Sequence, residues 1–149
     1  MVRLPGKAAL LIMVLLIGIG AANCSLLNGG TGESKVNFLY DWNEALSRAQ
    51  AENKPIMINF YTDTCPACEK LDSNTYSDEE LGDFLNDNFV CLKSNTLKSN
   101  LYQNYSNIEY VPTIVFASPD GTEIDRMVGY RSASAFYQDA QEVLSQWEP

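Results

Sequence analysis

The sequence predicts an α/β fold in which one mixed β-sheet is flanked by helices, and three observations support this prediction. Short, nearly continuous apolar runs at residues 55–61 and 89–92 are typical of strands that are covered on both faces. Segments with helical spacing of apolar residues separate these runs, which favours parallel pairing of the strands. Two later apolar runs, at 111–116 and 124–128, are joined by a Pro-Asp-Gly turn and predict an antiparallel hairpin.

The helices are marked by capping residues. Asp41, with a glutamate three residues later, predicts the start of a helix that ends before residues 53–55, Asn-Lys-Pro. Residues 77–80, Ser-Asp-Glu-Glu, form a second start signal of the same kind. Either Ser132 or Ser134 is expected to cap the last helix. The apolar residues of that helix lie at helical spacing: Phe136, Ala140, Val143, Leu144 and Trp147.

Residues 1–22 have the composition of an export signal. Arg3 and Lys7 precede a long apolar run without charge, and small residues end this run. The segment is therefore expected to be a signal peptide or an N-terminal membrane anchor. Cys24 follows the run as the lipidated cysteine of bacterial lipoproteins does, but Asn23 stands where those proteins usually have a small residue. Each alternative places the rest of the chain outside the cytoplasmic membrane.

The remainder of the chain is expected to be a short tether and one domain. Residues 23–35 are rich in glycine and polar side chains, which predicts a flexible tether. Residues 36–149 have the length of a single ordinary domain, and they show no internal repeat or second domain.

Charge and composition exclude several function classes. The chain has 10 basic and 19 acidic residues, for a net charge of −9, so it should repel the phosphates of nucleic acids. It contains no histidine, which excludes His-based acid–base catalysis, Cys-His nucleophile pairs and His metal sites. Any proton transfer must therefore use carboxylates, lysines, tyrosines, thiols or water.

The sequence Cys65-Pro66-Ala67-Cys68 allows three interpretations: a metal site, a structural disulfide or a redox centre. A zinc site usually needs four ligands, and here only Cys91 joins the pair as a third candidate. A disulfide across so small a loop stabilises a fold little, so a redox role is favoured over a structural one. Cys91 itself lies in an expected buried strand, where it acts either as a small apolar filler or as a third redox thiol.

Over about residues 38–147 the chain resembles thioredoxin-fold proteins. The resemblance rests on Phe60-Tyr61-x-x-x-Cys65-x-x-Cys68, on Val111-Pro112-Thr113, and on Asp120-Gly121 followed by Val128-Gly129. The sequence Cys-Pro-Ala-Cys-Glu-Lys-Leu and the following Thr-Tyr-Ser-Asp look most similar to one branch. That branch contains the exported thioredoxin-like domain of transmembrane thiol:disulfide interchange proteins and related small thioredoxin-like proteins and lipoproteins.

The resemblance implies a thioredoxin fold and roles for particular residues. Cys65 is expected to be the exposed nucleophile at a helix N-terminus, and Cys68 the more buried thiol that resolves the mixed disulfide. Pro112 is expected to be a cis proline. The backbone of Val111 is expected to pair with a bound substrate strand. Three further residues are expected to line the substrate groove: Thr64, Pro66 and Ala67.

This sequence also departs from the family pattern. Many thioredoxins have a buried aspartate six residues before the first cysteine, and here that residue is Asn59, which cannot take a proton from Cys68. Thr64 replaces a frequent tryptophan, so the docking surface should differ. Tyr61 either lines the site or packs in the core, and Lys93 is either a countercharge for the thiolate or a solvated lysine.

These observations predict an extracytoplasmic thiol–disulfide oxidoreductase that exchanges disulfides with proteins, with reduction or isomerisation slightly preferred to oxidation. No cofactor or metal is expected besides the redox-active pair Cys65–Cys68. The expected partners are protein thiols and disulfides and an electron donor of the membrane or thioredoxin type, with the chain itself a monomer. Two alternatives are a non-catalytic thioredoxin-fold binding module and an assembly factor for a metal enzyme at the membrane.

Overall fold

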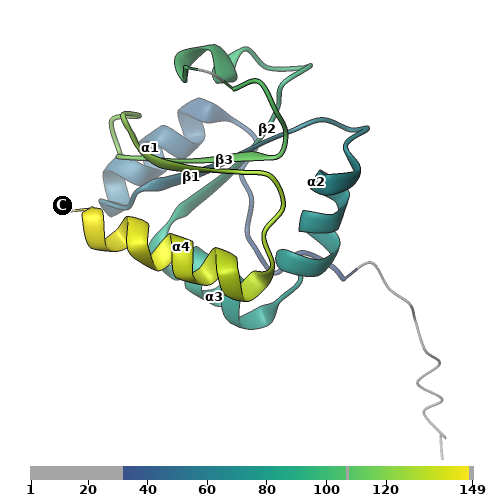
Figure 1. The fold of residues 1–149 in the computed structure, drawn as a ribbon. Coiled ribbons are helices and arrows are strands. Elements are labelled where there is room, and N and C mark those ends of the chain that lie inside the picture. Colours follow the sequence, from purple (N-terminus) through teal and green to yellow (C-terminus); the bar gives the residue numbers. More distant parts are fainter. Residues whose placement is uncertain (1–31, 107, 148–149) are drawn as a thin grey trace, which may run out of the picture.

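A four-stranded mixed sheet forms the centre of the molecule, as Figure 1 shows for this computed structural model, which describes residues 32–106 and 108–147. The order of the strands across the sheet is β2-β1-β3-β4. The first two strands are parallel, and the other two pairs are antiparallel, which confirms the predicted mixed sheet with its late hairpin. The strands are β1 (Ile56–Tyr61), β2 (Val90–Asn95), β3 (Thr113–Ala117) and β4 (Glu123–Val128).

Helices cover both faces of this sheet, with α1 on one face and α3 and α4 on the other (Figure 1). The short helix α2 follows β1 and continues directly into a π-helical turn, η1, so one helical segment leads away from the sheet edge. The helices are α1 (Trp42–Glu52), α2 (Pro66–Lys70), η1 (Leu71–Thr75), α3 (Glu79–Asn88), the 3₁₀ turn η2 (Leu101–Asn104) and α4 (Ala133–Gln146).

The helix starts agree with the predicted capping residues, with one change. Asp41 accepts a hydrogen bond from the backbone N–H of the third helical residue of α1, and Ser132 caps α4 in the same way. For α3 the cap is Asp78 and not Ser77. The Ser77 hydroxyl is already used, because it donates to the Ser73 carbonyl one turn earlier, at 2.7 Å.

The ends of two strands differ from the apolar runs in the sequence. Strand β2 continues through Lys93 to Asn95, because its pairing with β1 provides backbone partners beyond the last apolar side chain. Strand β3 begins at Thr113 and not at Val111, because Pro112 has no N–H to donate to the ladder. Both differences fall at the same edge of the sheet, where the chain becomes polar.

Alternation along β1 divides the interior into two layers. Ile56, Ile58 and Phe60 pack toward α1, whereas Met57 packs toward α3 and α4. Asn59 occupies the same face as Met57, since side chains two residues apart in a strand point to the same side. A buried amide is therefore placed in the apolar layer below α2 and η1.

The chain before α1 runs along the outer edge of β2. Leu39 forms a parallel bridge with Leu92 and extends the sheet there. The Lys35 N–H donates to the carbonyl of Tyr76, and the Asn86 side chain binds the backbone of residues 35 and 37. Lys35, which the sequence assigns to the tether, is thus hydrogen-bonded to the domain through its backbone. The expected signal segment and Cys24 lie outside the described residues.

Candidate active site

Four chain segments meet at one edge of the sheet. The parallel strands β1 and β2 both end there, β3 begins there and β4 ends there, as the register of Phe60 with Thr113 and of Thr113 with Val128 requires. The loop after β1 leads to Cys65 and Cys68, and the loop before β3 contains Val111 and Pro112. The topology therefore brings together sequence motifs that are more than 40 residues apart.

Cys65 and Cys68 are joined by a disulfide at the start of α2. The Cys65 sulfur accepts a hydrogen bond from the backbone N–H of Cys68 at 3.1 Å and so caps the helix. Pro66 occupies the first helical position, where a missing N–H costs nothing. Thr64 and Pro66 are exposed and Ala67 is half-buried, so these three form the outer surface around the disulfide.

The exposure of the two cysteines differs from the expectation. Cys65 was expected to be exposed and Cys68 buried, but their exposed fractions are 6% and 4%. One cause is the Val111 carbonyl oxygen, which lies 3.5 Å from the Cys65 sulfur and covers it from the β3 side. This sulfur carries no proton in the disulfide, so the contact becomes a hydrogen bond only after reduction.

The Val111–Pro112 loop is held from both sides. The peptide bond between the two residues is cis. The Thr113 hydroxyl donates to the carbonyl of Tyr110 at 2.7 Å, and the N–H of Gly129 donates to the carbonyl of Pro112 at 2.8 Å. Gly129 has a φ of +85°, a conformation that glycine adopts without strain. The loop therefore presents a fixed backbone edge to the disulfide.

The polar residues on the buried side of the site form a second group. Asn59 is 1% exposed, and among the described residues its Oδ1 has no hydrogen-bond partner. Its register partner in β2 is Lys93, so both side chains lie on the same face of the sheet. The Asn59 amide oxygen and the Lys93 ammonium group thus lie in the same layer, below α2 and η1.

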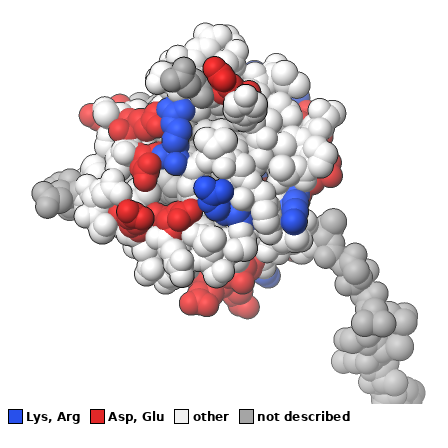
Figure 2. Space-filling view, viewed as in Figure 1, with Lys and Arg blue, Asp and Glu red and all other residues white. Residues whose placement is uncertain are grey.

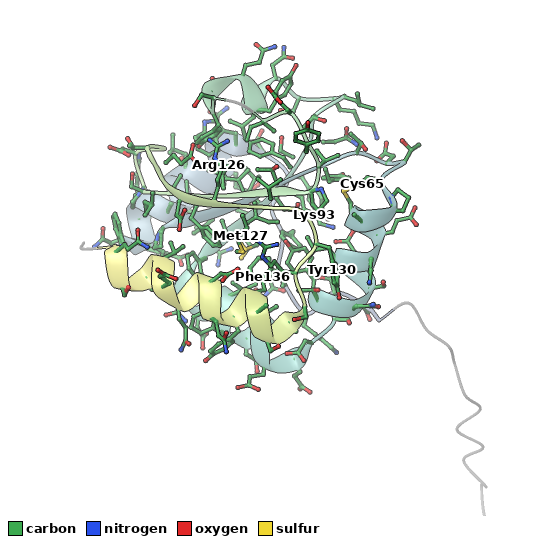
Figure 3. All side chains as sticks on the ribbon, in the orientation of Figure 1. Cys65, Lys93, Arg126, Met127, Tyr130 and Phe136 are labelled. Carbon is green, nitrogen blue, oxygen red and sulfur yellow. A yellow bond between two sulfur atoms is a disulfide. The ribbon has the colours of Figure 1, made fainter. Side chains whose placement is uncertain are left out.

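Lys93 is not a solvated lysine. Its side chain is 11% exposed, and its Nζ lies 2.5 Å from Oδ1 of Asp72 in η1. The same nitrogen lies 5.0 Å from the ring centre of Phe38 and 5.4 Å from that of Tyr61, which is favourable for a cation. Figure 3 shows Lys93 in the interior between the sheet and the helix that carries Cys65.

Asp72 is the residue of this group that the sequence analysis missed. Its spacing contains a signal, because it follows Cys68 by four residues along a continuous helical segment and so lies on the same side. Asp72 and Lys93 both line an open cavity of about 580 Å³ beside α2. The other residues that line it are Gly32, Ser34, Pro66, Glu69, Lys70 and Ser73.

The acidic residues that flank the cysteines differ in their surroundings. Asp63 accepts a hydrogen bond from Asn95 at 2.9 Å and forms an ion pair with Lys98 at 2.7 Å, so its charge is compensated. Glu69 is exposed on α2. Acidic side chains also gather away from the site, and Figure 2 shows one such group low in the picture, over α3.

Cys91 lies away from the disulfide, in the layer between the sheet and α3. It is a free thiol, and burial raises its pKa to about 12. Its sulfur lies 3.8 Å from the carbonyl oxygen of Leu85.

Within residues 32–106 and 108–147, no group of three or more Cys, Asp or Glu residues is arranged to hold a metal ion. In the same part of the chain, no helix is both long and apolar enough to cross a membrane.

Comparison with known proteins gives matches over most of the chain. A family model described as a thioredoxin-like domain matches residues 42–143. A thiol:disulfide interchange protein DsbD from Pseudoalteromonas atlantica is 32% identical over 130 residues, which are 80% of this chain and 22% of that protein. The chain therefore spans about a fifth of the length of this relative.

Two solved structures illustrate the similarity of fold. A thioredoxin from Thermus thermophilus gives a TM-score of 0.65 with 26% identity, over 74% of this chain and 88% of that one. The oxidised C-terminal domain of DsbD from Neisseria meningitidis gives a TM-score of 0.59 with 19% identity, over 71% of this chain and 98% of that one. The thioredoxin fold predicted from the sequence is confirmed.

Proposed function

We propose that this chain, which belongs to the thioredoxin-like domain family, exchanges disulfides with protein substrates outside the cytoplasmic membrane. The observation that carries this proposal is the Cys65–Cys68 disulfide at the start of α2, next to the Val111 carbonyl. A pair of cysteines three residues apart stabilises a fold little, so its position beside a fixed backbone edge supports a chemical role.

The geometry supports a reaction in two exchange steps. In the reduced protein, the Cys65 thiolate attacks one sulfur of a substrate disulfide, and the other substrate sulfur leaves as a thiolate and takes a proton. Cys68 then loses its proton and attacks the Cys65 sulfur, which releases the second substrate thiol. Two electrons have passed to the substrate, and the Cys65–Cys68 disulfide is formed again. No bound cofactor takes part.

The surroundings of Cys65 support its role as the attacking sulfur. It caps α2, and the N–H of Cys68 points at its sulfur, which stabilises a thiolate at that position. The Val111 loop lies on the other side of the sulfur, so a substrate strand that pairs with Val111 brings its own disulfide within reach. The surface that this strand would cross is formed by Thr64, Pro66 and Ala67.

The proposal also covers the direction of electron transfer and the cellular location of the protein. Reduction or isomerisation is preferred to oxidation within this proposal, and the name of the similar protein from Pseudoalteromonas atlantica, thiol:disulfide interchange protein, supports disulfide exchange as the reaction. Electrons then come from a membrane or thioredoxin-type donor. The apolar N-terminal segment, with Arg3 and Lys7 before it, exports the domain and either tethers it or is removed. The chain acts as a monomer.

Trapping of a mixed disulfide tests this function. The Cys68→Ser variant should accumulate a covalent complex with its substrate in cells, because the second exchange step is blocked, and Cys65→Ser should trap nothing. The reduction potential of the wild-type pair decides the direction: about −270 mV is typical of reductants and about −120 mV of strong oxidants. If Cys65→Ser retains full function in cells, the protein is a binding module instead.

A further inference from the structure

The chain enters the described domain beside the helix that carries the disulfide. Gly32 is the first residue that the structure describes, and together with Ser34 it lines the open cavity that Pro66 also lines. Pro66 directly follows Cys65 in the sequence and begins α2. The point at which residues 1–31 join the domain and the reactive disulfide therefore lie on the same side of the molecule.

Packing and hydrogen bonds fix this entry point. A Cβ atom on Gly32 would collide with the side chain of Ser77, so the backbone here is in close contact with the turn between η1 and α3. The Lys35 N–H donates to the carbonyl of Tyr76 at 2.6 Å, and the side chain of Val36 is buried. The first described residues are therefore held in place against η1 and α3.

The opposite end of the domain lies away from the disulfide. The turn between β3 and β4 is at that end, because β3 begins and β4 ends at the edge of the sheet that carries the site. Trp42 lies against this turn, where a Cβ atom on Gly121 would meet its ring at 3.2 Å. Helix α4 runs away from the site to Trp147, and Figure 1 shows α2 and the C-terminal end on opposite sides of the molecule.

The short length of the expected tether makes the entry point decisive. The sequence predicts attachment to the membrane through residues 1–22 or through a lipid on Cys24, and both lie outside the described residues. Residues 23–31 or 25–31 would then connect the membrane with Gly32. A flexible segment of this length spans about 13–18 Å on average, whereas a domain of about 115 residues is about 35 Å across. Such a tether keeps the side of the entry point close to the bilayer.

We propose that the Cys65–Cys68 disulfide faces the membrane and exchanges with cysteines that a membrane protein presents close to the bilayer surface. This inference rests on the exchange function and the N-terminal attachment proposed above, and it adds where the partner holds its cysteines. Nine extended residues reach about 30 Å, which limits how far from the membrane the entry point can move. The end of the domain that carries Trp42 and Trp147 faces away from the bilayer.

Paramagnetic broadening of NMR signals tests the orientation. The full chain, with residues 1–31 retained, is placed in phosphatidylcholine nanodiscs that contain a gadolinium-chelating lipid. Amide signals of α2 and η1 should lose most of their intensity, whereas the indole signals of Trp42 and Trp147 should keep theirs. A control variant carries about 27 additional Gly and Ser residues after Thr31, which raises the average span of the tether to about 30–36 Å. The difference between the two ends of the domain should largely vanish in this variant.

A disulfide on a lipid head group tests the consequence for exchange. Vesicles contain phosphatidylethanolamine with a 2-pyridyl disulfide, and the Cys65 thiolate attacks the lipid-side sulfur, so that pyridine-2-thione leaves and is measured by its absorbance. Cys68 then attacks Cys65, and the lipid leaves as a thiol. The long-tether variant should react about five- to tenfold more slowly than wild type, because effective concentration falls roughly as the −3/2 power of tether length. Both proteins should react equally fast with soluble 2,2′-dithiodipyridine.

The outcomes separate this inference from the function on which it rests. If reduced wild type reacts with neither reagent, the exchange function itself is wrong. If it reacts with the soluble reagent but the two tryptophan signals broaden as strongly as those of α2, the proposed orientation is overturned. Equal rates of the two tether lengths with the lipid disulfide also overturn it. The same holds if the cells that make the protein contain only a chain without residues 1–22 and without a lipid on Cys24.

Discussion

Two cysteine environments in one domain show how position decides the chemistry of a thiol. Cys65 and Cys68 lie beyond the end of β1, at a sheet edge where backbone groups, a carboxylate and an open cavity meet. Cys91 lies inside β2, two residues before Lys93, and packs in the apolar layer against α3. All three are buried, so exposure alone does not distinguish them.

The groups that surround each sulfur atom explain why the two cysteine environments favour different chemistry. The Cys65 sulfur has an N–H donor at 3.1 Å, which stabilises a negative sulfur. Both sulfur atoms lie near a carbonyl oxygen, that of Val111 for Cys65 and that of Leu85 for Cys91, but Cys91 is otherwise packed among apolar side chains, and this burial disfavours its thiolate. The cysteine that caps the start of α2 is thus prepared for exchange, whereas the cysteine in the interior of β2 serves as packing.

The largest expected difference is in alkylation of the reduced native protein. At pH 8, a thiol with a pKa of about 12 is ionised in only about one molecule in 10,000, so Cys91 should react with iodoacetamide at least about 100-fold more slowly than Cys65. Mass-spectrometric peptide mapping over time gives both rates in the same sample. Labelling in urea is the control, since unfolding should make Cys91 as reactive as an ordinary thiol. Equal native rates would remove the contrast between the two environments.

A smaller effect is expected on stability at alkaline pH. The unfolded Cys91 thiol ionises near pH 9 and the folded one near pH 12, so the folded state holds this proton more tightly. The contribution to stability is complete below pH 9 and is lost as pH rises through the window from 9 to 12. Between pH 8 and pH 10, wild type should therefore lose about 1.4 kcal/mol more than Cys91→Ala.

Urea unfolding of both proteins under reducing conditions measures this difference. Tyr105, whose pKa burial raises from 10.0 to about 12, contributes a smaller alkaline loss that begins at higher pH, and it does so equally in both proteins. The comparison of wild type with Cys91→Ala thus isolates the strand cysteine. Parallel loss of stability in the two proteins would mean that Cys91 ionises as easily in the folded state as in the unfolded one.

The same contrast explains what the sequence could and could not predict. The apolar runs and caps at Asp41 and Ser132 specify the sheet and its helices, because burial and capping are local in the sequence. The cysteine motif and the Val111–Pro112 motif identify the edge where the site lies. Sequence reasoning also placed Cys91 in a buried strand, and its position inside β2 confirms this placement.

The polar group of Asn59, Lys93 and Asp72 beside the cysteine site could not be predicted from such local patterns. From the sequence, Lys93 is either a countercharge for the thiolate or a solvated lysine, and only the pairing of β2 with β1 turns it toward Asp72 in a distant helical turn. The low exposure of Cys65 likewise depends on Val111, 46 residues later. Such contacts arise from the register of strands and the packing of helices, which no local pattern encodes.

The smallest expected effect concerns the exposed ion pair next to the reactive cysteine. Lys98→Met leaves the Asp63 carboxylate without its cation, two residues before Cys65, and an unpaired negative charge disfavours a nearby thiolate. Because both side chains are solvated, alkylation of Cys65 by the neutral reagent iodoacetamide should slow by less than about threefold, and the effect should vanish near 1 M salt.

Two controls connect this last measurement with the comparison of the cysteines. Arg48→Met breaks the ion pair with Glu52 on α1, remote from the site, and should leave the Cys65 rate unchanged. The Cys91 rate should be the same in wild type and in Lys98→Met, because burial limits its reactivity, whereas Arg48→Met removes a charge that lowers the Cys91 pKa and should slow this thiol further. A tenfold slowing in Lys98→Met that persists in high salt would show that Asp63 acts on the thiolate through a poorly solvated path. The reactive cysteine would then depend on surface charge far more than its local hydrogen bond and its contact with Val111 suggest.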